Sequence, residues 1–223
     1  MDDSPFFSII IPTYNRASVL PDAIRSVLDQ KYSNFELIIV DDGSTDETEE
    51  VIASFRDKRI RYIQKINEER SIARNTGIYH ASGSYVSFLD SDDFLYDNHF
   101  SEAYKFISQT DRPEVFHLNF ERVYGSKKPN MAESLPHVVN DVVLDDNRLS
   151  CNGVFIRRDI ANKIKFIHHR RATYTEDTEL WIRLSSRYVF HHRPVITSVI
   201  QMHDRRSAYI VKPRELLKSF LLI

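Results

Sequence analysis

The chain has 223 residues, a formal net charge of −2 and a hydrophobic fraction of 42%. This length and composition suffice for a sizeable core, so we interpret residues 1–223 as a single domain. The charge provides no basic field that would gather nucleic acid, so we expect no nucleic-acid partner. Cys151 is the sole cysteine and cannot form an internal disulfide, so the composition does not indicate an oxidising compartment.

Neither end of the chain carries a recognisable targeting or membrane-spanning signal. Residues 1–5 are acidic and lack the apolar core of a signal peptide. The apolar runs are much shorter than the roughly 20 residues that cross a bilayer. We therefore expect a cytoplasmic protein. Its basic stretches at 157–158 and 168–171 could make peripheral contact with anionic lipids at the inner face of the membrane, although a solvated face is the simpler interpretation. The apolar tail at 211–223 is interpreted as a docking helix, a membrane-surface helix or the truncated end of a longer protein.

The first 95 residues alternate between predicted strands and helices. Ser44 and Glu47 form a capping box at the predicted start of one helix. The alternation, with continuously apolar strands, predicts a parallel sheet covered by helices on both faces. The expected fold class is therefore α/β, with a mostly parallel central sheet. Apolar runs predict strands at 6–11, 35–40, 59–64 and 85–89, and apolar periodicity predicts helices at 17–30, after residue 44 and at 72–81.

The second half of the chain is less regular. It contains no internal repeat and no clear linker, and residues 127–130 are interpreted as an exposed loop. The pattern predicts strands at 115–120, 138–144, 154–156 and 195–202, and helices around 100–107 and at 176–187.

Polar residues follow three of the predicted strands in the first half. They are residues 13–15, residues 41–42 and residues 90–93. In open sheets of this class, ligands bind beyond the carboxyl ends of the strands. We therefore expect these three segments to share one crevice.

The run from Asp90 to Asp93 holds three carboxylates within four residues. Such groups repel one another unless a cation lies among them, and carboxylate oxygens suit Mg²⁺ or Mn²⁺. The alternative interpretation is a solvated acidic turn that caps the next helix. Asp41 and Asp42 form a second acidic turn, which either caps a helix or accepts hydrogen bonds from a nucleobase.

Several common nucleotide and hydrolase motifs are missing. The five glycines form no G-x-G-x-x-G, no phosphate-binding loop precedes a Lys-Ser or Lys-Thr pair, and no G-x-S-x-G occurs. Phosphates would therefore need a metal and arginines. Arg70 and Arg74 are candidates, and helix-surface charge is the alternative explanation for them.

Five segments of the chain form an ordered set of motifs: Phe7–Arg16, Val40–Asp46, Ala73–Gly77, Phe88–Asp93 and Glu176–Trp181. In this order they resemble family 2 glycosyltransferases with the GT-A fold, and the resemblance spans residues 6–207. It implies a Rossmann-like nucleotide-sugar-binding half at 1–95 and an acceptor-binding half at 96–210 that supplies the catalytic base.

The resemblance also implies roles for individual residues. Asp177 matches the catalytic base, with Glu176 as the second candidate. His203 approaches the metal or diphosphate, although Gln201 stands where the family usually has arginine. Asp92 and Asp93 are the other expected metal ligands. The expected donor-binding residues are Pro12, Thr13, Tyr14, Asn15, Asp41, Asp42, Arg70, Arg74, Asp90, Ser91 and Asp92, among which Tyr14 stacks on the base and Asp42 reads the uracil edge.

The expected activity is inverting transfer of a sugar from a nucleotide-diphosphate sugar, expected to be a UDP-sugar, to a hydroxyl of a glycan or glycolipid. The expected setting is the synthesis of a cell-surface polysaccharide or glycolipid. A divalent cation, Mn²⁺ or Mg²⁺, would neutralise the departing diphosphate, and a carboxylate would take the acceptor proton.

Two alternative functions remain open. A nucleotidyltransferase usually carries a glycine- and arginine-rich opening loop, whereas residues 12–16 contain no glycine. A non-catalytic sugar-nucleotide-binding module would keep Asp42 and the Asp90–Asp93 run but would not need Asp177.

Overall fold

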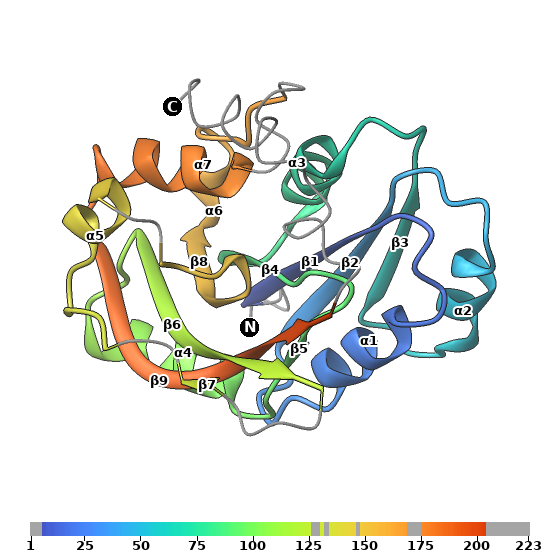
Figure 1. Cartoon of the computed structure of the whole chain (residues 1–223), viewed down its shortest axis with the longest axis horizontal. Helices are drawn as coiled ribbons and strands as arrows, with labels where there is room; N and C mark the ends of the chain where they lie inside the picture. Colours follow the sequence, from blue (N-terminus) through green and yellow to red (C-terminus); the bar gives the residue numbers. More distant parts are fainter. Residues whose placement is uncertain (1–5, 126–129, 132–133, 146–147, 169–174, 204–223) are drawn as a thin grey trace.

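The computed structural model describes residues 6–125, 130–131, 134–145, 148–168 and 175–203 (Figure 1). The predicted alternation in the first half is confirmed, and each element lies within a few residues of its expected position. In chain order the elements are β1 (Phe7–Thr13), α1 (Leu20–Leu28), β2 (Phe35–Asp41), α2 (Thr48–Ser54), β3 (Ile60–Gln64), α3 (Arg70–His80) and β4 (Tyr85–Phe88).

The second half adds shorter elements that the sequence pattern did not predict, among them β5, α6 and the 3-10 turn η1. The last strand, β9, begins five residues before its predicted start. The elements are β5 (Phe94–Leu95), α4 (His99–Gln109), β6 (Val115–Tyr124), β7 (Asn130–Met131), α5 (Asn140–Asp145), η1 (Cys151–Gly153), β8 (Val154–Arg157), α6 (Arg158–Ala161), α7 (Glu176–Ser185) and β9 (Phe190–Met202).

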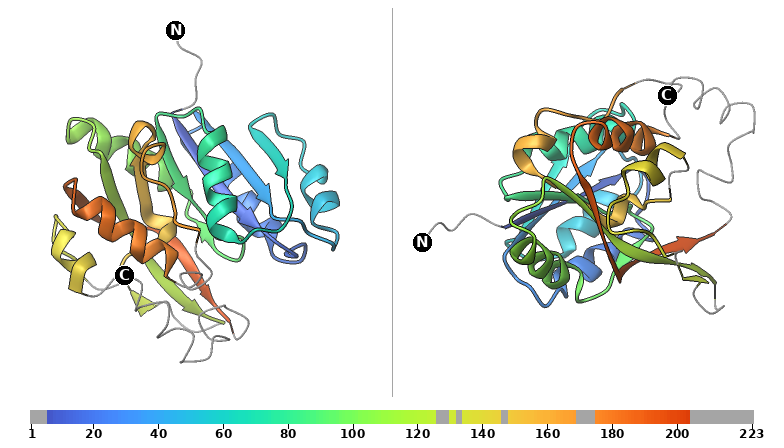
Figure 2. Two further views of the ribbon diagram at one scale, coloured as in Figure 1. Left: turned by 90° about the horizontal axis from the view of Figure 1, so that it is seen from above. Right: turned by 90° about the vertical axis from the view of Figure 1, so that its left-hand side faces the viewer.

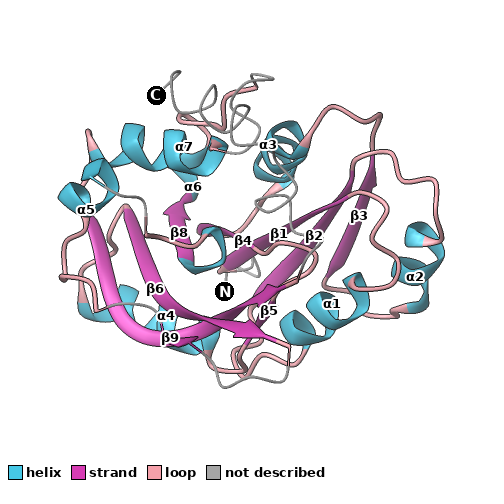
Figure 3. Cartoon of the chain, in the orientation of Figure 1, coloured by secondary structure: helices cyan, strands magenta, loops and turns pink. Residues whose placement is uncertain are grey.

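The described strands form one curled sheet in the order β3-β2-β1-β4-β8-β6-β9-β5, with β7 paired to β6 (Figure 3). Strands β1 to β4 are parallel, as predicted. The second half is mixed, because β8 runs antiparallel to both β4 and β6 and β5 runs antiparallel to β9. The α/β class is confirmed, and parallel pairing is concentrated in the first half.

Helices cover both faces of the sheet (Figure 2). Side chains alternate along a strand, so neighbouring residues of β1 enter different cores. Ile10 packs in the cluster that includes residues of α3 and α7. Ile9 and Ile11 pack in the cluster that includes residues of α1 and α4. The continuous apolar pattern of β1 follows from this double burial.

Gly77 lets α3 press closely against β1. A Cβ at this position would lie 2.4 Å from Cγ2 of Ile10. Real carbon atoms do not approach so closely, so a larger residue would push the helix away from the strand.

We therefore expect Gly77→Ala to destabilise the protein by about 1–3 kcal/mol through overpacking, more than enough to cancel the better helix propensity of alanine. Urea unfolding monitored by circular dichroism measures the change. Tyr79→Phe, at an exposed position of the same helix, is the control and should leave stability nearly unchanged. An alanine variant as stable as the wild type would contradict the close packing.

The prediction of a strand at 138–144 is wrong, because residues 140–145 form helix α5. Val139 and Val143 are both buried, a four-residue spacing that suits a helix. The Asn140 amide donates to the carbonyls of Ser185 and Tyr188 and thereby ties the start of α5 to the end of α7. This tertiary anchor outweighs the β propensity of the valines.

The predicted capping box at Ser44 and Glu47 is also wrong. Helix α2 begins at Thr48, and its N-cap residue, Glu47, makes no side-chain capping bond. The Ser44 hydroxyl instead accepts a hydrogen bond from the Asn15 N–H at 2.9 Å. The Asp46 carboxylate accepts hydrogen bonds from the amide and hydroxyl of Thr48. Ser44 therefore ties two strand-end loops together rather than starting the helix.

Some expectations fall on residues that the structure does not describe. The C-terminal tail at 211–223 is one, and the loop at 127–130 is another except for Asn130, which belongs to β7. Within the described part of the chain, no helix combines the length and apolar character needed to cross a bilayer.

Candidate active site

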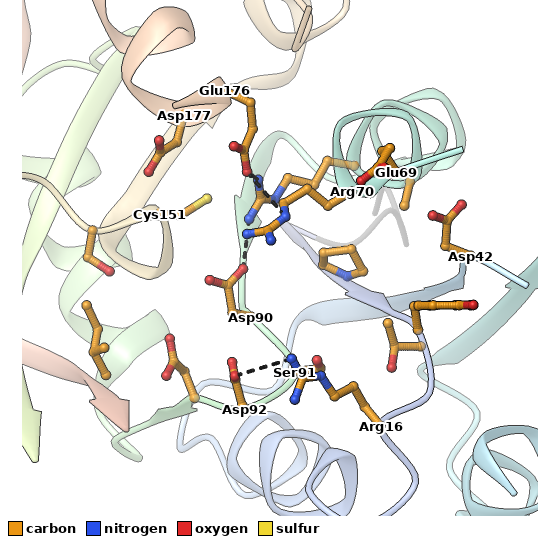
Figure 4. A pocket seen from close by; sticks show the side chains of 18 of the residues that line it. Arg16, Asp42, Glu69, Arg70, Asp90, Ser91, Asp92, Cys151, Glu176 and Asp177 are labelled. Atoms are coloured by element: carbon orange, nitrogen blue, oxygen red, sulfur yellow. Dashed lines mark hydrogen bonds and ion pairs between the residues drawn. The ribbon is translucent and has the colours of Figure 1, made fainter. Parts of the chain in front are cut away.

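A cavity of about 510 Å³ opens at the carboxyl ends of β1, β2 and β4 (Figure 4). The expected crevice is therefore present, since residues from all three strand ends line it together with the first turn of α7. Most of the predicted site residues line this cavity: Pro12, Thr13, Tyr14, Asp42, Arg70, Arg74, Asp90, Ser91, Asp92, Asp93, Glu176 and Asp177.

Arg74 joins the two halves of the site. Its guanidinium is fully buried and donates to Oδ1 of Asp90 and to Oε1 of Glu176, both at 2.8 Å. Loss of one partner from such a buried pair leaves an uncompensated charge, which is strongly unfavourable. Arg74 is thus not a surface charge of helix α3. It holds the end of β4 against the start of α7.

The two candidate bases on α7 differ in their partners. Glu176 is buried and bound to Arg74, and Arg70 lies 3.7 Å from it. Oδ1 of Asp177 accepts from the N–H of Thr178 at 2.7 Å, and no described cation pairs with Asp177. Burial raises the pKa of both carboxyl groups above the usual values, most strongly opposed by Arg70 at Glu176 and by Arg74 at Asp177. Of the two, only Glu176 forms an ion pair among the described residues.

Asp92 lines the cavity, and His203, which is not among the lining residues, contacts Asp92. Nε2 of His203 lies 3.0 Å from Oδ2 of Asp92, and the Arg16 guanidinium lies 4.0 Å from the same oxygen. Among the described residues no group of three His, Cys, Asp or Glu side chains is arranged to hold a metal ion. A carboxylate and an imidazole would therefore need further oxygen ligands to complete a divalent cation site.

Both oxygens of Asp93 already accept hydrogen bonds from the protein. Oδ2 accepts from the Asn152 amide at 2.8 Å and Oδ1 accepts from the Gln201 N–H at 2.9 Å. Asp93 thus links the end of β4 to η1 and to β9. It remains a predicted metal ligand, and it would have to exchange one of these bonds to bind a cation.

Asn15 and Asp41 do not line the cavity. The Asn15 side chain accepts from the N–H of Thr45 at 2.8 Å. The fully buried Asp41 accepts from the N–H of Ser44 and from the hydroxyl of Tyr62, both at 2.8 Å. Both residues shape the loops that hold their neighbours Tyr14 and Asp42 in the cavity wall.

Several cavity residues were not predicted. Asn67 and Glu69 precede α3, and residues 149–151 lead into η1. Glu69 has a left-handed backbone, with φ of 77°. Asn67 and Glu69 follow the predicted strand at 59–64, whose end was not among the three strand ends considered, so the same rule could have found them. Residues 149–151 precede a predicted strand, and strand-end reasoning gives no signal for them. Asn152 does not line the cavity, but it holds two residues that do. Its amide oxygen accepts from the Asp90 N–H, and its amide nitrogen donates to the Asp93 carboxylate.

The chain matches the glycosyl transferase family 2 over residues 8–177. It belongs to this family. An uncharacterised glycosyltransferase of Rickettsia typhi is 32% identical over 214 residues, which are 92% of this chain and 66% of that protein. The family 2 membership agrees with the resemblance inferred from the sequence motifs.

Solved structures with low sequence identity share the fold. TarS of S. aureus (residues 1–349), in complex with UDP-GlcNAc, has a TM-score of 0.76 at 21% identity, with 92% of this chain and 61% of that chain covered. The mannosyltransferase PcManGT of Pyrobaculum calidifontis, in complex with GDP-Man and Mn²⁺, has a TM-score of 0.67 at 17% identity, with 91% and 58% covered. The GT-A fold class is therefore confirmed.

The chain spans a small part of some relatives. Two glycosyltransferases from Rickettsia conorii and Rickettsia felis match at 48% identity over 105 residues, which are 17% of their length. The matched region of those proteins is therefore one part of a larger protein.

Proposed function

We propose that this glycosyltransferase moves a sugar from a UDP-sugar to a hydroxyl group of a glycan or glycolipid acceptor, with inversion at the anomeric carbon. The observation that carries the proposal is the single cavity shared by Asp42, Asp92 and Asp177. A donor-binding wall and a candidate base face the same space, as transfer between two substrates requires.

The donor would lie along the strand ends. Tyr14, a residue that is 47% exposed, offers a flat ring surface for a base, and Asp42 offers an acceptor for a base N–H. Arg16 and Arg70 line the cavity near the expected position of the diphosphate. Guanidinium groups suit phosphate oxygens through paired N–H donors. Relatives in complex with UDP-GlcNAc and with GDP-Man support a nucleotide-sugar donor.

Asp92 and His203 fit a divalent cation that is completed by diphosphate oxygens. The carboxylate and imidazole atoms converge to 3.0 Å, and Mn²⁺ accepts both types of ligand. When bound, such a cation would offset the negative charge of the departing diphosphate.

Asp177 would act as the general base. The acceptor hydroxyl gives its proton to the Asp177 carboxylate while its oxygen bonds to the anomeric carbon. The bond from that carbon to the β-phosphate oxygen breaks, and the electron pair leaves with the nucleoside diphosphate. Attack from the side opposite the leaving group inverts the anomeric centre. Glu176, paired with Arg74, would position the first turn of α7 rather than take the proton.

Arg74 also bears on the alternative functions. A non-catalytic nucleotide-binding module would not need the buried Arg74 contacts that join Asp90 in the donor wall to Glu176 on α7.

We also propose that the product of the reaction is a cell-surface polysaccharide or glycolipid.

A thermal-shift screen of nucleotide sugars, with and without Mn²⁺, tests the proposal. A donor at about 100 times its Kd should raise Tm by about 5 °C or more, because it binds only the folded state. The stabilising donors should then release nucleoside diphosphate in the presence of an acceptor, and a chelator should abolish this turnover. Full activity in chelator would contradict the metal role. The donor proposal would fail if no nucleotide sugar stabilises the protein in either condition.

A further inference from the structure

His117, a fully buried residue of β6, contacts the chain segment that enters the η1 turn. Its Nε2 accepts a hydrogen bond from the Ser150 N–H at 3.2 Å, and its Nδ1 lies 3.1 Å from Nδ1 of His192. The turn packs closely on the ring, since a Cβ at Gly153 would lie 2.6 Å from Nε2 of His117. A change in the ring therefore acts directly on the turn.

These contacts determine which nitrogen of His117 carries the proton. Burial lowers the pKa of His117 well below its usual value, so the ring is neutral at pH 7 and has a single N–H. Nε2 accepts from a backbone N–H and cannot carry that proton, which therefore lies on Nδ1. The Nδ1–H of His117 donates to Nδ1 of His192, so the proton of neutral His192 lies on its Nε2.

This arrangement leaves one buried donor unsatisfied. His192 is 1% exposed, and its Nε2 has no hydrogen-bond partner among the described residues. A buried donor without an acceptor is unfavourable and uncommon in folded proteins, so it requires an explanation. The fold tolerates it and thereby keeps an unprotonated Nε2 of His117 facing Ser150.

The turn connects His117 to two acids of the cavity wall. Ser150 caps the turn, because its hydroxyl accepts from the Asn152 N–H at 3.2 Å. The Asn152 amide in turn binds the Asp90 N–H at 3.1 Å and the Asp93 carboxylate at 2.8 Å. Both acids and Ser150 line the cavity. A chain of hydrogen bonds thus runs from β6 to the acids that follow β4.

We propose that His117 is a positioning residue of the reaction: its unprotonated Nε2 fixes the turn and thereby holds Asp90 and Asp93 in the cavity wall. The inference rests on the proposed glycosyltransferase function, in which Asp93 is a predicted metal ligand. Replacement of residues that orient metal ligands typically lowers metal affinity or activity by about 10–100-fold. His117 acts through Ser150 and Asn152, so we expect an effect near the lower limit.

The test compares His117→Asn with His117→Gln. Both variants lose the ring and gain an uncharged amide, but only glutamine is long enough to place an amide oxygen where Nε2 accepts from Ser150. We expect His117→Asn to weaken UDP binding in Mn²⁺ and to lower kcat, each about tenfold, and His117→Gln to stay within about threefold of the wild type. Titration calorimetry measures the affinity, and release of nucleoside diphosphate measures kcat.

Two controls separate positioning from a loss of stability. His99→Asn makes the same replacement at another fully buried histidine, which contacts Thr197 rather than the turn. It should lower stability in urea, as His117→Asn does, but leave UDP binding in Mn²⁺ unchanged. In chelator, the wild type and His117→Asn should bind UDP equally, because Tyr14 and Asp42 follow β1 and β2 rather than the turn.

Nitrogen NMR of histidine-labelled wild-type protein tests the tautomer directly. The signals that disappear in His117→Gln belong to His117, and they should show a protonated Nδ1 and an unprotonated Nε2. A proton on Nε2 of His117 would overturn the inference. Equal UDP binding by His117→Asn and His117→Gln in Mn²⁺ would overturn it as well.

The outcomes also separate this inference from the function on which it rests. If the folded wild type binds no UDP, either in Mn²⁺ or in chelator, the proposed function itself fails. If Mn²⁺ does not strengthen UDP binding to the wild type, the cation of the proposed function fails, and with it the role given to Asp93.

Discussion

Asp177→Asn should lower kcat about a thousandfold, within the range that positioned general bases contribute. The amide has nearly the shape of the carboxylate but cannot take the acceptor proton. Oδ1 of Asp177 accepts from the Thr178 N–H, and an amide oxygen can keep that bond. The fold and the donor affinity should therefore change little. Release of nucleoside diphosphate under saturating donor and acceptor measures kcat, and calorimetry with UDP measures donor binding.

Glu179→Gln is the matched control, because it replaces a carboxylate by an amide on the same helix. Glu179 pairs with Arg183 and does not line the cavity. Its kcat should stay within a few-fold of wild type. Unchanged turnover in Asp177→Asn would remove the assignment of the base, whereas loss of UDP binding would point to a disturbed cavity.

The pH dependence of the reaction follows from the same carboxyl group. Burial raises the pKa of Asp177 above its usual range, and the group must be ionised to accept a proton. Activity should therefore fall as pH decreases through this raised pKa, at a higher pH than for an ordinary aspartate with a pKa of about 3.9. A profile of kcat/KM against pH that stays flat down to pH 4 would contradict the burial of this base.

Acidification below pH 6.5 should destabilise the folded protein strongly, because three histidines are buried in neutral form. Burial lowers the pKa of His99 to about 3 and that of His192 to about 4, and it lowers the pKa of His117 well below the usual value. The unfolded chain binds protons near pH 6.5, while the folded protein resists protonation. The stability is present above pH 6.5 and is lost as the pH falls toward the folded-state values.

For His99 the loss between pH 7 and pH 5 is about 2 kcal/mol of unfolding free energy. Urea unfolding at a series of pH values measures it. The raised pKa values of Glu176 and Asp177 act in the opposite direction, because the folded state then holds protons that the unfolded state releases. The contribution of Glu176 and Asp177 cancels when the wild type is compared with a variant of His99, because both proteins contain these two carboxyl groups.

His99→Gln should therefore show a shallower loss of stability between pH 7 and pH 5 than the wild type. Glutamine does not titrate and can still bond to the Thr197 hydroxyl, which lies 2.8 Å from Nδ1 of His99. Ser108→Ala, at an exposed position of the same helix α4, removes no titratable group and should retain the wild-type slope. Equal slopes in wild type and His99→Gln would show that His99 does not resist protonation in the fold.

The sequence by itself determined the features that depend on short-range pattern and on a general rule of topology. Apolar runs and helical spacing predicted the strands and helices of the first half, because strand and helix periods are local properties. The rule that ligands bind beyond the carboxyl ends of parallel strands predicted that Thr13, Asp42 and Asp92 share one cavity. The family followed from the same strand-end motifs together with the segment at Glu176–Trp181.

Only the tertiary structure decided how the site residues share their partners. Arg74 and Glu176 are 102 positions apart, and no local pattern indicates that they pair. The valines at 138–144 favour a strand, yet the amide of Asn140 ties them into a helix against α7. His117 meets Ser150, 33 positions away, only because β6 packs against the η1 turn. These outcomes depend on long-range packing, in which burial and the need to satisfy buried polar groups outweigh local propensity.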